Sequence, residues 1–106
     1  MIQIKISSDF TNKPGGRYIS EGPYSGEEFR KKLLLPAYDK ALNSNEKLRV
    51  DLDGCYGFAT SFLEEAFGGL VREVKSKKII EMLEIVTEDR PGLIDKVLDF
   101  IKNADA

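Results

Sequence analysis

Two adjacent hydroxyl side chains, Thr60 and Ser61, lie where a predicted strand turns into a predicted helix. The strand covers residues 48–53, and the helix continues as an apolar stripe over residues 62–74. A phosphoryl group at the start of a helix is favoured by the helix dipole. A serine there also suits a capping box, with Ser61 as the cap and Glu64 three residues later. The spacing therefore fits both a phosphorylation switch and a purely structural cap.

A phosphate on Ser61 would abolish the cap and lie close to Glu64 and Glu65, so it would change surface charge far more than fold. That property suits the control of binding. Two aromatic residues beside the turn, Tyr56 and Phe58, are suited to anchor an interface. We expect these aromatic residues and the two glutamates to contact a partner protein, under the control of the hydroxyls.

Two arginines, Arg17 and Arg30, flank the loop before the first long helix. Together they could bind an anion such as a nucleotide phosphate, and parallel sheets place pockets at the carboxyl ends of their strands. A small-ligand or nucleotide-binding module is therefore the alternative function.

The segment Asp51-Leu-Asp-Gly54 resembles the first motif of haloacid-dehalogenase-type phosphatases. In that reading Asp51 would be the nucleophile and Asp53 the acid/base, around Mg²⁺. Cys55 stands where that motif has threonine, and the chain is short for that fold. Alternating carboxylates on a half-exposed strand explain the segment without catalysis, so we expect the protein not to be an enzyme. We interpret Cys55 as a small packing residue.

Composition excludes several classes of function. The chain has 106 residues, one cysteine and no histidine, so internal disulfides and the common His/Cys zinc sites cannot form. Its 16 basic and 18 acidic residues give a net charge of −2, which does not supply the basic face that nucleic-acid binding needs. No apolar run approaches membrane-spanning length, and no signal peptide is evident. We expect a cytoplasmic protein without cofactor, metal or membrane contact.

Apolar periodicity predicts the elements that position these residues. The predicted strands cover residues 1–7, 17–20, 48–53 and 79–87, and the predicted helices cover residues 26–42, 61–74 and the segment from Pro91 to about residue 101. We expect Ser25 to cap the first helix in a capping box with Glu28. Pro36 should kink or break that helix near Leu34. The mid-helix pair Gly68-Gly69 suggests the close approach of another backbone, from the sheet or from a partner.

This order predicts an α/β fold in one domain spanning residues 1–106. We expect a small mixed sheet of about four strands, largely parallel after the first hairpin, with about three helices mainly on one face.

Several motifs together resemble a known family. They are Gly16-Arg-Tyr-Ile-Ser20, Ser25-Gly-Glu-Glu-Phe-Arg30, Leu33-Leu-Leu-Pro36, Val50-Asp-Leu-Asp-Gly54 and Thr60-Ser-Phe-Leu-Glu-Glu-Ala-Phe-Gly-Gly69. The chain resembles the STAS-like bacterial domains of unknown function, which are similar in turn to the STAS domains of anti-sigma-factor antagonists. That resemblance implies a signalling domain in which Ser61 accepts a phosphoryl group, with Thr60 as its neighbour. It also implies a partner that is a kinase-fold ATPase or an anti-sigma-type regulatory protein.

Overall fold

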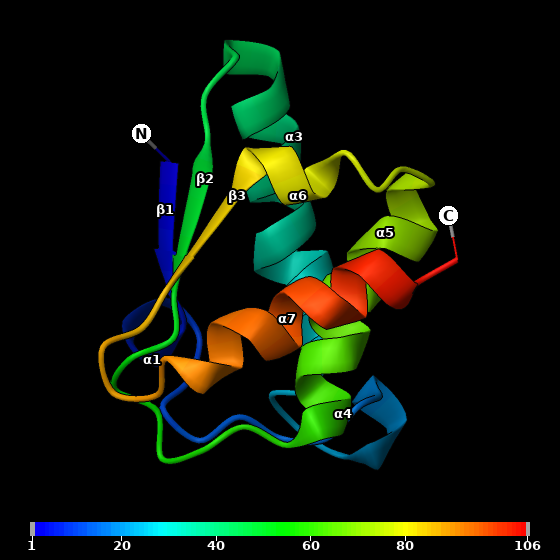
Figure 1. The fold of residues 1–106 in the computed structure, drawn as a ribbon. Helices are drawn as coiled ribbons and strands as arrows, with labels where there is room; N and C mark the ends of the chain where they lie inside the picture. Colours follow the sequence, from blue (N-terminus) through cyan, green and yellow to red (C-terminus); the bar gives the residue numbers. More distant parts are fainter. Residues whose placement is uncertain (1, 106) are drawn as a thin grey trace.

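A three-stranded, all-parallel sheet forms one layer of the molecule, and the computed structural model describes residues 2–105 (Figure 1). The strands are β1 (Ile2–Lys5), β2 (Leu48–Asp51) and β3 (Leu83–Val86), and β2 lies in the middle. In register, Ile4 pairs with Val50 and Val50 pairs with Ile85. Each connection between neighbouring parallel strands therefore carries a helical crossover, as the alternating order requires.

The predicted return strand over residues 17–20 is wrong, and with it the fourth strand and the mixed sheet. A short 3₁₀ helix, η1 (Ile19–Glu21), forms instead. The Glu21 carboxylate accepts hydrogen bonds from the backbone N–H groups of Arg17 and Tyr18, at 3.1 and 2.8 Å. Side-chain oxygens thus satisfy the donors that a strand would have used in a ladder.

Three main helical segments accompany the sheet. The first comprises α2 (Gly26–Phe29), η2 (Arg30–Leu34) and α3 (Leu35–Ser44); the second comprises α4 (Thr60–Leu63), η3 (Glu64–Gly68) and α5 (Gly69–Val74); the third is α7 (Gly92–Asn103). Two shorter helices, α1 (Ile6–Asp9) and α6 (Ile79–Met82), replace the last residues of the predicted first strand and the first residues of the predicted last strand. Those two strands are therefore shorter than predicted, although Ile6 and Ile79 are still buried.

The start of the first segment confirms the predicted cap. The Ser25 hydroxyl accepts a hydrogen bond from the Glu28 N–H at 3.0 Å. The Glu28 carboxylate accepts from the N–H of Tyr24, at 3.1 Å, rather than from that of Ser25. The capping box is therefore half formed, with its second bond shifted by one residue.

The predicted break at Pro36 takes the form of a π-helical segment. The chain remains helical through Leu34 and Leu35, and η2 directly precedes the turn that contains the proline. Proline has no backbone N–H to donate. A π-helical segment changes which carbonyls accept hydrogen bonds, so the helix can continue past Pro36 without that donor.

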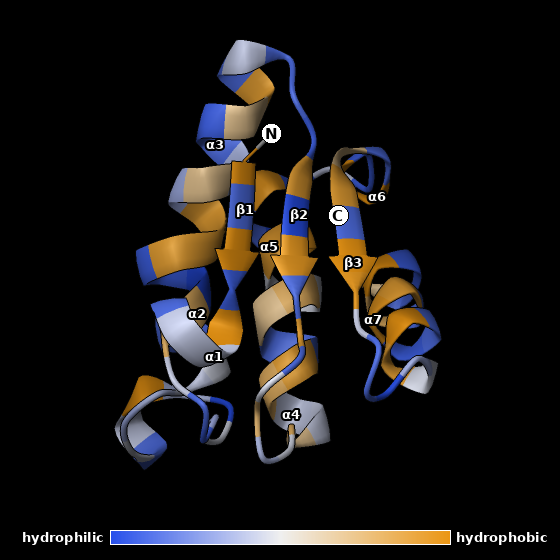
Figure 2. Ribbon diagram, turned by 90° about the vertical axis from the view of Figure 1, so that its left-hand side faces the viewer, coloured by the Kyte–Doolittle hydropathy of each residue, from blue (hydrophilic) through white to orange (hydrophobic). Residues whose placement is uncertain are grey.

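The helices pack against one face of the sheet and leave the other face open (Figure 2). Along β2, Leu48 and Val50 are buried while Arg49 and Asp51 between them are half-buried. This alternation explains the period-two pattern of the strands. Among residues 2–105, no helix has both the length and the apolar character needed to cross a bilayer.

Aromatic packing fixes α4 beside α2. Phe29, Phe62 and Phe67 are fully buried, and the rings of Phe29 and Phe62 stack with centroids 5.8 Å apart. Gly26 allows this approach, because a Cβ atom there would overlap the carbonyl oxygen of Phe62. Burial of each such aromatic side chain contributes about 1.5–3 kcal/mol, so the start of α4 is held firmly in place.

Candidate functional site

The turn after β2 is built by short-range polar contacts. The Asp51 carboxylate accepts a hydrogen bond from the Asp53 N–H at 2.9 Å, which ends the strand in an Asx-type turn. Gly54 has a φ of +91°, a conformation that glycine adopts without steric cost. The N–H of Tyr56 then donates to the carbonyl of Asn12 at 2.9 Å. This hydrogen bond connects the loop after β1 to the loop after β2, at the carboxyl ends of the strands.

The hydroxyls of Thr60 and Ser61 occupy the first two positions of α4. The helix cap is Ala59, whose backbone is extended and whose side chain makes no capping bond. The prediction that Ser61 caps the helix is therefore wrong. Thr60 is exposed and Ser61 is half-buried. Within the described chain neither hydroxyl forms a hydrogen bond, so capping does not explain either residue.

The two aromatic residues of the turn differ in exposure. Tyr56 is 74% exposed and Phe58 is half-buried, with its ring 5.7 Å from that of Phe62. The ammonium of Lys13 lies 5.5 Å from the centre of the Tyr56 ring, and Arg90 donates to the Tyr56 carbonyl at 2.9 Å. Phe58 thus ties the turn to the core, while Tyr56 presents an accessible ring.

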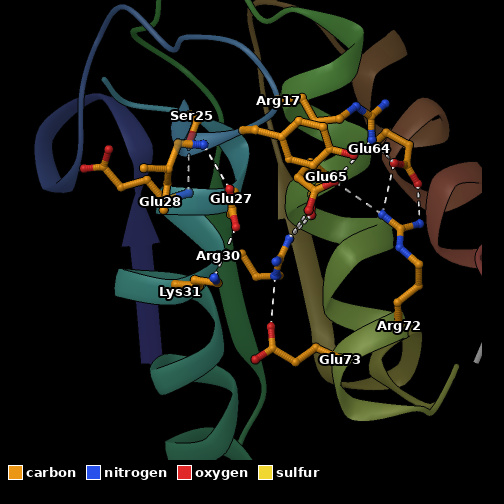
Figure 3. Close-up of polar contacts among 12 residues, drawn as sticks. Arg17, Ser25, Glu27, Glu28, Arg30, Lys31, Glu64, Glu65, Arg72 and Glu73 are labelled. Atoms are coloured by element: carbon orange, nitrogen blue, oxygen red, sulfur yellow. Dashed lines mark hydrogen bonds and ion pairs between the residues drawn. The ribbon is translucent and has the colours of Figure 1, made fainter. Parts of the chain in front are cut away.

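An arginine–glutamate cluster lies one helical turn further along the same helix (Figure 3). Arg17 contacts Glu64 at 2.5 Å and Glu65 at 3.2 Å. Arg72 holds the other side of Glu64 with two bonds of 2.7 and 3.1 Å. The loop before α2 is thereby fastened to η3.

Arg30 forms the buried part of this cluster. Its guanidinium donates to the backbone carbonyl of Glu65 at 2.7 Å, to the carboxylate of Glu65 at 2.6 Å and to Glu73 at 3.0 Å. A Cβ atom at Gly69 would overlap this guanidinium, and one at Gly68 would overlap the Glu64 carboxylate. The expectation that another backbone approaches the glycine pair is therefore wrong: charged side chains occupy the space.

The pairings shift the pKa values of the exposed members. Hydrogen bonds from Arg72 and then Arg17 lower the pKa of Glu64 despite partial burial, because they stabilise the ionised carboxylate. The hydrogen bond to Glu64 raises the pKa of Arg17 and that of Arg72. The cluster pairs three arginines with three glutamates, so its formal charges balance.

The structure brings four of the predicted site residues into this cluster: Arg17, Arg30, Glu64 and Glu65. Both arginines already have carboxylate partners. Glu65 is 8% exposed, so a partner could contact it only if the cluster opened. Sequence reasoning missed the roles of Arg72 and Glu73. The one available signal is helical spacing. Arg72 lies eight residues after Glu64, and Glu73 lies eight residues after Glu65, so each pair shares one face of the helix.

Asp53, the acid/base of the phosphatase alternative, fastens β2 to the loop after β3. Its carboxylate accepts from the Thr87 hydroxyl at 2.7 Å and from the N–H groups of Glu88 and Asp89 at 2.8 and 3.1 Å. These bonds lower the pKa of Asp53, with the Thr87 bond the largest cause. Among the residues that the structure describes, no three metal-ligating side chains gather. The carboxylate thus has a clear structural function.

The comparisons with known proteins identify the family. A model of the STAS-like domain of unknown function (DUF4325) matches residues 25–93, which include the first crossover from α2 onward, the whole second crossover and the turn that carries Thr60 and Ser61. The chain belongs to this family. Comparison with curated proteins and with solved structures gave no significant match.

Proposed function

We propose that this protein is a regulatory protein-binding domain, and that phosphorylation of Ser61 or Thr60 controls its partner. The observation that carries the proposal is the placement of the two hydroxyls in the first turn of α4, beside an exposed turn and without hydrogen-bond partners in the described chain. The first turn of a helix favours an added phosphate through the dipole and unpaired N–H groups.

The surface beside these hydroxyls has the character of a binding site. Tyr56 supplies an accessible aromatic ring, while Phe58 holds the turn against the core. Aromatic residues on a rigid support lose little conformational entropy on binding, and they frequently dominate interface energies. The turn and the start of α4 therefore form the proposed contact surface.

Phosphorylation of Thr60 or Ser61 would alter the ion pairs of the arginine–glutamate cluster. Residues four apart are neighbours on a helix surface, so Thr60 lies over Glu64 and Ser61 lies over Glu65. Arg17 bridges those two glutamates. A phosphoryl group would repel both carboxylates and attract Arg17. Phosphorylation would then weaken the contacts that fasten the loop before α2.

The class of partner rests on the resemblance to anti-sigma-factor antagonists. In those proteins the switch serine is phosphorylated by an ATPase of the histidine-kinase fold, which then releases the phosphorylated form. A kinase-fold ATPase or anti-sigma-type regulator is accordingly the partner that we propose for this chain.

Purified candidate partners from the native organism would test the proposal directly. The partner is expected to bind the wild-type chain, to phosphorylate it with ATP, and to release the Ser61→Glu variant. Ser44→Glu is the matched control, because it adds the same charge at the exposed end of α3. Equal binding of wild type and Ser61→Glu, with no phosphate transferred to Ser61 or Thr60, would overturn the switch.

Nucleotide binding by Arg17 and Arg30 is the second candidate. It would require displacing Glu64 or Glu65 from the arginines that they contact. Thermal stabilisation by a nucleotide, lost in Arg17→Ala, would favour this candidate over the switch.

A further inference from the structure

A small cavity lies at the end of the molecule opposite the proposed switch. Its volume is about 350 Å³, within the range of small-molecule sites. Its lining residues come from α3, the end of α5, the following loop and α6. These elements lie near the amino ends of the strands (Figure 1). The cavity shares no residue with the Tyr56 turn or with the arginine–glutamate cluster.

Apolar side chains form most of its wall. Leu42 is 54% exposed, and Val74 and Met82 are half-buried around the same space. Methionine adapts its shape readily, because it is unbranched and has three rotatable bonds. This wall suits a compact apolar body, such as an aromatic ring or a short alkyl chain.

Tyr38 supplies a polar group inside the cavity. The residue is 5% exposed and lines the space, yet its hydroxyl forms no hydrogen bond among residues 2–105. Every fully buried side-chain nitrogen or oxygen in that part of the chain has a partner, so the Tyr38 hydroxyl is not fully enclosed. Because Tyr38 lines the cavity, its hydroxyl is a polar group that a ligand in the cavity can contact.

The charges at the rim favour a cationic ligand. Asp39 and Glu81 contribute two carboxylates, whereas Lys78 contributes one ammonium. Burial, and then the nearby charge of Asp39, raise the pKa of Tyr38. In the described chain no ion pair occupies either rim carboxylate.

We infer that this cavity binds a small amphipathic amine, with its apolar body against Leu42, Val74 and Met82. The ammonium lies between Asp39 and Glu81, where it also donates a hydrogen bond to the Tyr38 hydroxyl oxygen. This site is independent of the proposed switch, and the failure of either leaves the other standing.

Three probes of similar size test the inference: 2-phenylethylammonium, neutral 2-phenylethanol and 3-phenylpropanoate. Binding is followed through the NMR signals of the Met82, Leu42 and Val74 methyl groups. The ammonium should bind in the millimolar range or tighter, and about three- to tenfold more tightly than the alcohol, as a partly exposed ion pair allows. The carboxylate should bind most weakly.

Variants separate the two halves of the site. Asp39→Asn should bring the affinity for the ammonium down to that for the alcohol, and Tyr38→Phe should weaken both while keeping the ring in the core. Asp99→Asn, on the exposed side of α7, is the matched control and should change neither. Absence of methyl shifts with all three probes, or equal binding of the ammonium and the carboxylate, would overturn the inference.

Discussion

Arg30 donates hydrogen bonds both to the backbone carbonyl of Glu65 and to its carboxylate, at 2.7 and 2.6 Å, with both side chains about nine-tenths buried. The two residues lie in the π-helical segments of different helices, η2 and η3. A π segment leaves carbonyls free of their usual helical donors, and here an arginine from the neighbouring helix supplies one. The buried Arg30–Glu65 ion pair therefore connects the π-helical segments of the two helices.

Removing one member of this pair should destabilise the fold. Arg30→Met leaves the Glu65 carboxylate without its main partner, and we expect the free energy of unfolding to fall by about 3 kcal/mol. Urea denaturation of Arg30→Met, Glu65→Leu and the double variant should reveal a coupling of about 1–3 kcal/mol. The exposed pair Arg49–Glu84 is the control, with an expected coupling below about 1 kcal/mol. Additive effects at Arg30 and Glu65 would contradict the prediction.

Gly69→Ala should destabilise the protein although alanine is the better helix former. The added methyl group would overlap the Arg30 guanidinium, so we expect a loss of about 1–3 kcal/mol in thermal or urea unfolding. Gly92→Ala, at the start of α7, meets no atom within 4 Å. That variant should be neutral or more stable by at most about 1 kcal/mol. A similar response at both positions would argue against the steric cause.

Acid should weaken the fold through Glu64. Because Arg72 and Arg17 lower its pKa in the folded state, the carboxylate stabilises the protein fully above its unfolded-state pKa of about 4.3. That contribution is lost as the pH falls through the lowered, folded-state pKa. Unfolding free energies between pH 7 and pH 2 should therefore decline less steeply for Glu64→Gln than for wild type. A constant difference between the two proteins across that range would contradict the assignment.

The single thiol should be unreactive in the folded protein. Burial raises the pKa of Cys55 to about 11, and its Sγ lies 3.5 Å from the carbonyl oxygen of Thr11. The thiolate is the reacting species, so alkylation by iodoacetamide at pH 8 should be about a hundredfold slower than for an unperturbed thiol. Protein denatured in guanidinium chloride provides the reference rate. Equal rates in the two states would show that the thiol is accessible and ionised.

The order of the elements followed from apolar periodicity. Ile4, Val50 and Ile85 each lie in a period-two segment, and these segments pair as the three parallel strands. The helix stripes likewise predict the three main helices, and the spacing of Ser25 and Glu28 predicts the cap, because capping depends on residues three apart. Features with a local physical cause, such as a helix cap, can be predicted from sequence. So can strands and helices that bury only one face, because their apolar residues recur at a fixed period.

The contacts of the candidate site could not be predicted in that way. The turn at residues 12–16 predicts a return strand over residues 17–20, yet the carboxylates of Glu21 and Glu27 accept hydrogen bonds from the N–H groups of residues 17–19. Ser61 fits a capping box, but the helix has Ala59 as its cap and begins at Thr60, with Phe62 packed against Phe29. The cap therefore lies two residues before the predicted one. At Ser61 a tertiary contact competes with a capping preference worth about 1 kcal/mol. At residues 17–20 the competitors are side-chain hydrogen bonds within the loop and the start of α2, which the strand pattern does not reveal.

The sequence by itself determined the α/β order, the covered and open faces of the sheet, and the position of two hydroxyls after a turn. Only the tertiary structure decided that Arg17 and Arg30 share one glutamate, and that charged side chains fill the space beside Gly68 and Gly69. The physical reason is range. Apolar periodicity involves residues that are close in the sequence. The ion pair between Arg30 and Glu65, 35 positions apart, forms only after two helices have packed.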